Sequence, residues 1–140
     1  MSTYAAGDNY QIDLVRTIAW MRVWKRPDLT LEQGAGQARE QRAQLVGLAN
    51  GSRAMAKALL LDLRAAPSSW GPITRGAIEE SLAAWEAAQR RIAILLSHDP
   101  VQGVLMRPSM KQAAPSMAHI FYTETDALDY CILGRLPPVE

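Results

Sequence analysis

The stretch that decides the fold is Ala58-Leu59-Leu60-Leu61-Asp62-Leu63, an almost continuous apolar run near the middle of the chain. A strand with one wet face alternates apolar and polar residues, whereas a strand covered on both faces is apolar throughout. Ile92-Ala93-Ile94-Leu95-Leu96 repeats the continuous pattern further along the chain. Two buried strands with a helix-length segment between them predict a parallel sheet with a helical crossover.

Helix signals separate these runs. Thr30-Leu31-Glu32-Gln33 predicts a capping box at the start of one helix, and Asn50-Gly51 predicts its end. Pro72 predicts the first turn of a second helix, and Asp99-Pro100 predicts the start of a third. We expect Pro108 to break or kink the third helix, because proline lacks the backbone N–H that a helix interior needs.

Further strands are expected before and after these elements. Residues 10–25 alternate in polarity, which indicates either a hairpin that turns near residues 15–17 or one long bent strand. No Gly, Asn or Pro marks a turn there, so the sequence leaves the two open. Residues 117–122 predict another strand, and Thr123 and Gly134 predict the limits of a final helix.

These signals predict a single small α/β domain with the element order β(β)αβαβαβα. We expect a mainly parallel sheet of four to five strands and about four helices. Residues 1–9 are assigned to a flexible N-terminus, residues 10–134 to the domain and residues 135–140 to a C-terminal tail.

The composition excludes several classes of protein. With 49% hydrophobic and 21% charged residues over 140 positions, the chain has the make-up of one globular domain. Its 15 basic and 14 acidic residues leave a formal net charge of +1, so we expect no nucleic-acid partner. No apolar run approaches the length of a transmembrane helix, and no signal peptide is evident. The single Cys131 cannot form an internal disulfide, which favours a cytoplasmic location.

Three stretches carry a resemblance to a known family. Leu60–Arg64 resembles the end of a strand, Arg91–Leu95 resembles a second strand, and Phe121–Tyr130 resembles the closing strand and helix of the STAS domain. The likeness covers residues 10–133 and is greatest to the stand-alone bacterial STAS/SEC14-like, SpoIIAA-like branch. The resemblance implies a regulatory domain that acts through protein–protein contact.

Phosphorylation is the part of this resemblance that does not transfer directly. Anti-sigma-factor antagonists of the family carry a phosphorylated Ser that would fall near Gly71 in this chain. Ser68 and Ser69 lie slightly before that position and Thr74 slightly after it. These three residues are therefore the candidates for regulatory phosphorylation at the start of the second helix.

Polar residues gather where the predicted strands end. In an open parallel sheet, ligands bind beyond the carboxyl ends of the strands. A hydrolase would need a nucleophile, a base and an orienting carboxylate there, but His98 and Asp99 are adjacent in sequence and Asp99 is expected to cap a helix. Capping and surface polarity are therefore favoured over catalysis. We expect no metal and no cofactor, because His and Cys are few and lack ligand spacing. The polar residues of this edge are Asp62, Arg64, Ser97, His98, Asp99, Thr123 and Glu124.

Aromatic residues in the first long strand suggest a contact surface. If Ala19 and Met21 face the core, then Trp20, Arg22 and Trp24 face the opposite side. Either a helix covers that side, or the two tryptophans are exposed around an arginine. The second arrangement is typical of protein-binding hot spots.

Three functions follow from these patterns. The first is a non-catalytic regulatory module that binds another protein, or a second copy as a homodimer, through Trp20, Arg22 and Trp24. The second, which the SEC14-like association implies, is a binder of a lipid or apolar small molecule. Its pocket is expected under the broken third helix and is expected to be lined by Leu105, Met106 and Met110. The third is a small hydrolase-like enzyme with its site at the strand ends.

Overall fold

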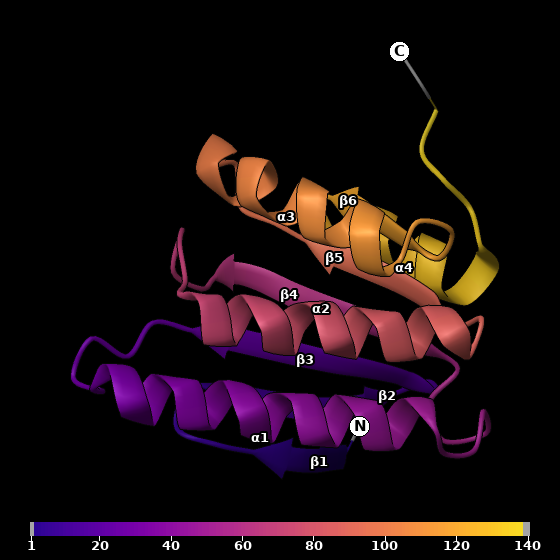
Figure 1. Ribbon diagram of the computed structural model, residues 1–140. Coiled ribbons are helices and arrows are strands. Elements are labelled where there is room, and N and C mark those ends of the chain that lie inside the picture. Colours follow the sequence, from indigo (N-terminus) through magenta and orange to yellow (C-terminus); the bar gives the residue numbers. More distant parts are fainter. Residues whose placement is uncertain (1, 139–140) are drawn as a thin grey trace.

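A six-stranded mixed sheet forms the centre of the molecule in the computed structural model, which describes residues 2–138 (Figure 1). The strands lie side by side in chain order, with β1, β2 and β3 antiparallel and β3 to β6 parallel. The expected α/β class is confirmed, but the sheet is larger and less parallel than expected. The strands are β1 (Ser2–Ala6), β2 (Tyr10–Val15), β3 (Ile18–Trp24), β4 (Ala58–Ala65), β5 (Arg91–Leu95) and β6 (Ala118–Phe121).

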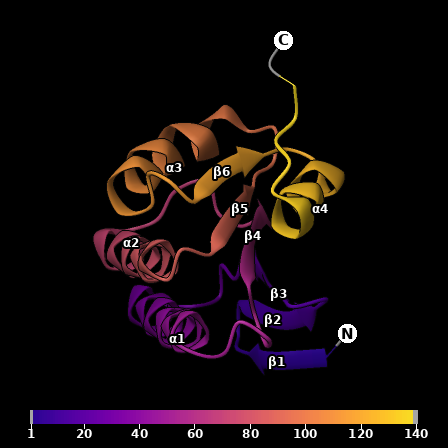
Figure 2. The ribbon, with the colours of Figure 1, turned by 90° about the vertical axis from the view of Figure 1, so that its right-hand side faces the viewer.

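Three helices cover one face of the sheet and a fourth covers part of the other (Figure 2). α1 (Leu31–Ala49), α2 (Pro72–Ala87) and α3 (Pro100–Ala113) each connect two neighbouring parallel strands. Right-handed crossovers between strands that follow one another in a single direction place every connecting helix on the same face. α4 (Glu124–Leu133) follows the last strand, lies on the opposite face and contacts β4, β5 and β6.

A tight hairpin joins β2 to β3, which resolves the alternative left open by the sequence. Val15 pairs with Ile18, so only Arg16 and Thr17 form the turn. Both have positive φ, 52° and 64°, the conformation that a two-residue hairpin turn with the correct twist requires. Neither residue favours this conformation, so the turn is imposed by the flanking strands, and Lys57 fixes it by donating its N–H to the Thr17 carbonyl.

The N-terminus corrects the prediction of a flexible segment. Residues 2–6 form β1, which pairs with β2 at the edge of the sheet. The strand is largely exposed, and only Ala5 packs against the main core, so its hydrophobic pattern is too weak to be recognised in the sequence. Pairing with β2 supplies the order that the pattern does not. At the other end, residues 135–138 are exposed and lack regular structure, and residues 139–140 of the expected tail lie outside the described residues.

The core has two layers, one on each face of the sheet. The larger lies under α1, α2 and α3 and includes Trp85, which is fully buried. The smaller lies under α4 and includes Trp20 and Tyr130. Alternate residues of each central strand contribute to opposite layers, which is why β4 and β5 read as continuous apolar runs.

The break that is one of the two outcomes expected at Pro108 does not occur in α3. The helix runs through Pro108 without interruption from Pro100 to Ala113. Pro108 is exposed, and the carbonyl deprived of its hydrogen bond is that of Val104, whose side chain is 66% exposed. Water can satisfy that carbonyl, so the helix continues.

Arg90, in the connection between α2 and β5, is a buried charged residue. Its guanidinium donates to the carbonyls of Leu48, Gly51 and Ala56, which lie at the C-terminus of α1 and in the loop that follows. Burial lowers the pKa of this guanidinium, and the charge of Arg53 acts in the same direction. Arg90 therefore holds the end of α1 against the α2–β5 connection.

Candidate functional site

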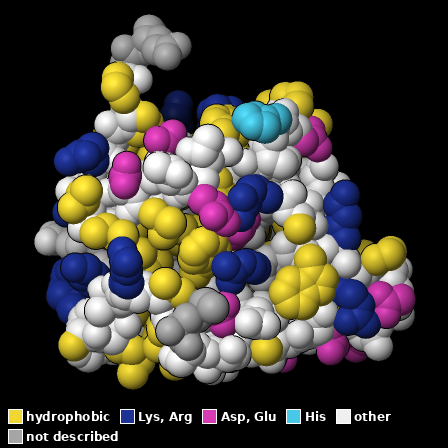
Figure 3. Space-filling model, turned by 180° about the vertical axis from the view of Figure 1, so that it is seen from behind, with side chains coloured by type: hydrophobic (Ala, Val, Ile, Leu, Met, Phe, Trp, Pro, Cys, Tyr) yellow, Lys and Arg dark blue, Asp and Glu magenta, His cyan; other side chains and the backbone are white. Residues whose placement is uncertain are grey.

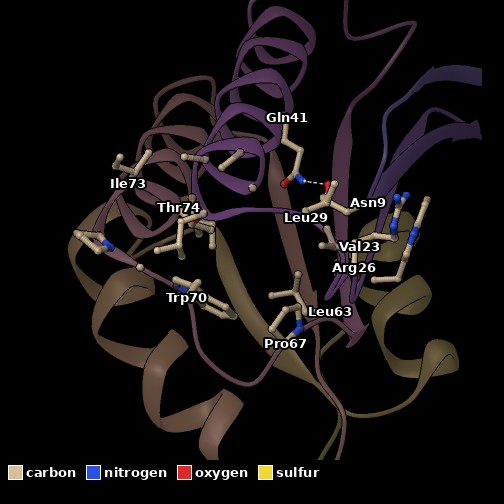
Figure 4. Close-up of a pocket in the computed structure, with 18 of the residues that line it drawn as sticks. Asn9, Val23, Arg26, Leu29, Gln41, Leu63, Pro67, Trp70, Ile73 and Thr74 are labelled. Atoms are coloured by element: carbon tan, nitrogen blue, oxygen red, sulfur yellow. Dashed lines mark hydrogen bonds between the residues drawn. The ribbon is translucent and has the colours of Figure 1, made fainter.

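A pocket of about 480 Å³ opens at the carboxyl ends of β3 and β4, between the N-terminal halves of α1 and α2 (Figure 4). Its floor is the sheet and two of its sides are helices. The residues that line it are Asn9, Met21, Val23, Trp24, Arg26, Leu29, Thr30, Leu31, Gly34, Ala35, Ala38, Gln41, Leu61, Leu63, Pro67, Trp70, Gly71, Pro72, Ile73, Thr74 and Ile78.

Small residues on α1 create the space. Gly34, Ala35 and Ala38 lie on the side of the helix that faces the pocket. A Cβ atom added at Gly34 would meet nothing within 4 Å, so the helix leaves room rather than packing against α2 at this end. Further along α1, Leu45 and Leu48 are buried and close the core. The change from small to large side chains along one helix therefore produces an open end and a closed end.

Apolar and aromatic side chains dominate the lining. Trp24 at the end of β3 and Trp70 in the β4–α2 loop both contribute to the walls, and both are half-buried. Leu31, the first residue of α1, and Ile73, the second residue of α2, lie at the mouth of the pocket. Leu31 is 95% exposed and Ile73 is 48% exposed. Exposed apolar side chains around an apolar cavity are typical of a ligand-binding site.

The loop that carries Trp70 is tied to neighbouring elements. Ser68 donates its hydroxyl to Asp99 at 2.6 Å, and Asp99 also caps α3 by accepting from the N–H of Val101. These two hydrogen bonds lower the pKa of the Asp99 carboxyl, with that from Ser68 the stronger cause. Gln102, which is buried, donates to the carbonyl of Leu63 at 2.7 Å. The pocket wall is thus held in place by the start of α3.

Among residues 2–138, Arg26 is the one formally charged residue that lines the pocket, and each of its three guanidinium nitrogens already donates one hydrogen bond. Its Nε and Nη2 atoms donate to the two carboxylate oxygens of Asp28 at 2.8 and 2.7 Å, and its Nη1 atom donates to the carbonyl of Asp8. The hydrogen bond from Arg26 lowers the pKa of Asp28 to about 2. The Arg26–Asp28 ion pair is therefore formed at neutral pH, and the Asp28 carboxylate offsets the charge of Arg26.

Trp20, Arg22 and Trp24, the predicted contact surface, are placed differently from one another. Trp20 is only 7% exposed, packs in the smaller core layer and donates its indole N–H to Asp62. Arg22 covers the Trp20 ring at 4.2 Å and pairs with Asp13 at 2.9 Å. Of the two arrangements that the sequence left open, the covered one holds for Trp20, because Arg22 and the core layer under α4 enclose it.

The polar residues expected at the strand ends divide into two groups. Asp62 accepts from Trp20 and from Arg64, which also pairs with Glu124 of α4 at 2.7 Å. Figure 3 views this face of the molecule, where basic and acidic side chains lie against one another near the centre. His98 stacks on Tyr122 instead. No nucleophile or base is placed against the Asp62 carboxylate among the described residues, so this cluster has the geometry of a structural ion-pair network.

The candidate phosphorylation residues also differ in setting. Ser68 is bound to Asp99, Ser69 is exposed in the same loop, and Thr74 is half-buried in the pocket wall.

The residues expected to form a pocket under α3, namely Leu105, Met106 and Met110, do not line the pocket between α1 and α2. Met106 is fully buried and Met110 packs against the larger core layer, because the unbroken helix keeps both on the sheet. The pocket at α1 and α2 was not predicted. Its available signal was the set Gly34, Ala35 and Ala38, which makes one side of an otherwise ordinary helix unusually small.

Among residues 2–138, no helix has the length and hydropathy needed to cross a bilayer, and no three His, Cys, Asp or Glu side chains are grouped to hold a metal ion. Comparison of the chain with protein-family models, with curated proteins and with solved structures found no match.

Proposed function

We propose that this protein binds a small apolar molecule in the pocket between α1 and α2. The observation that carries the proposal is the pocket itself, whose volume of about 480 Å³ and apolar, tryptophan-containing walls are those of a small-molecule site. Its position beyond the carboxyl ends of two parallel strands is also the usual position of ligand sites in open α/β sheets.

Two other observations support binding in the pocket over the contact-surface hypothesis. The guanidinium of Arg22 stacks on the Trp20 ring, and Trp20 is buried. The strand therefore does not present the pair of exposed tryptophans on which the contact-surface hypothesis depended. The SEC14-like side of the STAS resemblance implies an apolar ligand.

The single Cys131, which is buried and unpaired, supports a cytoplasmic location.

Binding is tested with N-phenylnaphthylamine, a neutral apolar dye that becomes fluorescent on leaving water. We expect dye emission when tryptophan is excited, because Trp24 and Trp70 lie in the pocket walls. A Gly34→Phe variant should abolish this signal, since its side chain would project into open space in the pocket. Phe is also a better helix former than Gly, so the substitution does not weaken α1 and the variant should fold.

Gly36→Phe is the matched control. Gly36 lies on the same helix, has equally open surroundings and does not line the pocket. It should bind the dye as the wild type does. If the dye does not bind, or if Gly34→Phe binds it as well as Gly36→Phe, the pocket is not a ligand site.

Protein contact remains the second candidate, now through a different element. β1 is an exposed edge strand with no charged residue, and backbone groups on such an edge can pair with a strand of a second copy. We propose an antiparallel β1–β1 homodimer as this alternative. Light scattering should then give the mass of a dimer for the wild type and of a monomer for Thr3→Lys with Ala6→Lys; a monomeric wild type would reject it.

A further inference from the structure

The pocket narrows toward the closed end of α1 and α2. A second, small cavity of about 20 Å³ continues from it between the two helices, which is the space of about one water molecule. Gln41 of α1 and Thr74 of α2 line both cavities, so their side chains mark the inner end of the pocket. Figure 4 shows Gln41 reaching down from α1 and Thr74 on the facing helix.

Most of the other polar side chains near this inner end are already hydrogen-bonded. The side-chain amide oxygen of Asn9 accepts a hydrogen bond from Gln41 Nε2 at 3.0 Å. The Thr30 hydroxyl caps α1 by accepting from the N–H of Gln33. In the small cavity, Arg42 pairs with Glu80 at 3.0 Å and Ser81 donates to the carbonyl of Ala77. Each of these groups already makes a hydrogen bond or an ion pair within the protein, and the Asn9 NH₂ group and the Thr30 hydroxyl proton are left as further donors.

Gln41 and Thr74 differ from that set. The bond to Asn9 uses the Gln41 NH₂ group and leaves its carbonyl oxygen as a free acceptor. The Thr74 hydroxyl has no hydrogen-bond partner among residues 2–138 and can both donate and accept. Both side chains are half-buried, so a ligand that fills the pocket would remove these two groups from water. Leaving them unpaired would then cost binding energy.

We propose that the ligand is a neutral apolar molecule with a hydroxyl group, and that this hydroxyl sits between the Gln41 carbonyl and the Thr74 hydroxyl. The inference rests on the proposed binding function. A hydroxyl can donate to Gln41 while it accepts from Thr74. The apolar body then extends toward Trp24 and Trp70, which line only the outer pocket.

Charged ligands fit the same groups less well. An anion cannot donate to the Gln41 carbonyl, and the Arg26 guanidinium is held by Asp28 and the Asp8 carbonyl. A cation would find no carboxylate in the pocket lining. Burying either charge without a partner is far more costly than burying a paired hydroxyl.

The test is displacement of bound N-phenylnaphthylamine by three compounds with the same ring system, namely naphthalene, 2-naphthol and 2-naphthoate. At neutral pH, 2-naphthol should displace the dye at a concentration on the order of fivefold lower than naphthalene does, as one added hydrogen-bonded pair provides. 2-Naphthoate should be the weakest of the three. Equal displacement by naphthalene and 2-naphthol would overturn the hydroxyl assignment.

Two variants locate the effect. Thr74→Val and Gln41→Met keep the size of each side chain, and each should remove the preference for 2-naphthol over naphthalene. The affinity for naphthalene should rise, because naphthalene no longer leaves that polar group unpaired. Gln44→Met, on the same helix but outside the pocket lining, should keep the preference. A preference that survives in both pocket variants contradicts the inference. If dye binds but no naphthalene compound displaces it, the ligand class is wrong while the binding function stands; if dye itself does not bind, the function fails first.

Discussion

Asp62 shows how a residue that resembles a catalytic acid serves the fold instead. Burial of its carboxyl opposes ionisation, but the hydrogen bonds from Arg64, together with a weaker one from Trp20, outweigh this effect and lower the pKa of Asp62. Both side-chain donors of Arg64 to Asp62 lie within 3.0 Å. The same arginine reaches Glu124, so Asp62 connects β4 to the start of α4.

Asp62 gives a prediction for the pH dependence of stability. Because its pKa is lower in the folded chain than in the unfolded chain, the stability from the ionised carboxylate is fully present above the unfolded value of about 4 and is lost as the pH falls through the folded value. Asp62→Asn should lower the free energy of unfolding at pH 7 by on the order of 1–3 kcal/mol. Urea denaturation should show this deficit shrinking as the pH is lowered below about 4.

Glu79→Gln on α2 is the control, and its effect should be small at every pH. A deficit for Asp62→Asn that stays constant down to the lowest pH would show that the charge of Asp62 does not contribute.

α3 shows how an element can override its own sequence signal. Its inward side carries buried Gln102, Met106 and Ser109 at helical spacing, and these contacts hold the helix to the sheet on both sides of Pro108. The proline occupies the outward side, where the lost hydrogen bond is exposed to water. The helix therefore survives with a local cost rather than a break.

This local cost can be measured. A proline inside a helix is less favourable than alanine by about 3 kcal/mol, part of which is recovered because proline also restricts the unfolded chain. Pro108→Ala should therefore raise the free energy of unfolding by about 1–2 kcal/mol, seen as a higher melting temperature. Lys111→Ala, at another exposed position of α3, should change it far less. A lower melting temperature for Pro108→Ala would mean that the proline is needed for the path of the helix.

At the scale of the whole molecule, stability depends on one junction in the larger core layer. Trp85 of α2 is fully buried and donates its indole N–H to the carbonyl of Leu45 in α1 at 3.0 Å. The guanidinium of Arg90 lies 5.9 Å from the centre of its ring. One side chain thus joins both helices and the loop that leads to β5.

Trp85→Ala should lower the free energy of unfolding by about 3–5 kcal/mol, because it leaves a large cavity and removes the hydrogen bond from the indole to the Leu45 carbonyl. Chemical denaturation followed by circular dichroism measures the loss. Trp24→Ala, at the half-buried pocket wall, is the comparison and should cost clearly less. A melting temperature for Trp85→Ala within a degree or two of the wild type would contradict the role of this junction.

The helices and central strands were predictable from sequence because their signals are local. The capping box at Thr30, the Asp99 and Thr123 caps and the left-handed Gly134 are all as expected. Each depends on residues within one or two helical turns. The buried runs of β4 and β5 were likewise recognisable, since burial on both faces leaves no polar alternation.

The strand at the N-terminus, the burial of Trp20 and the pocket were decided only by tertiary structure. β1 exists because β2 lies beside it, and Trp20 is enclosed by Arg22 and by a core layer whose other members come from β4, β5, β6 and α4. The pocket arises because the small residues of α1 meet the first turns of α2 above two strands. These segments lie far apart in the sequence, and no local sequence pattern indicates how closely the surfaces of two distant elements pack. The local sequence therefore determined the four helices and the central strands, whereas the packing of distant elements determined the edge strand β1, the burial of Trp20 and the position of the pocket.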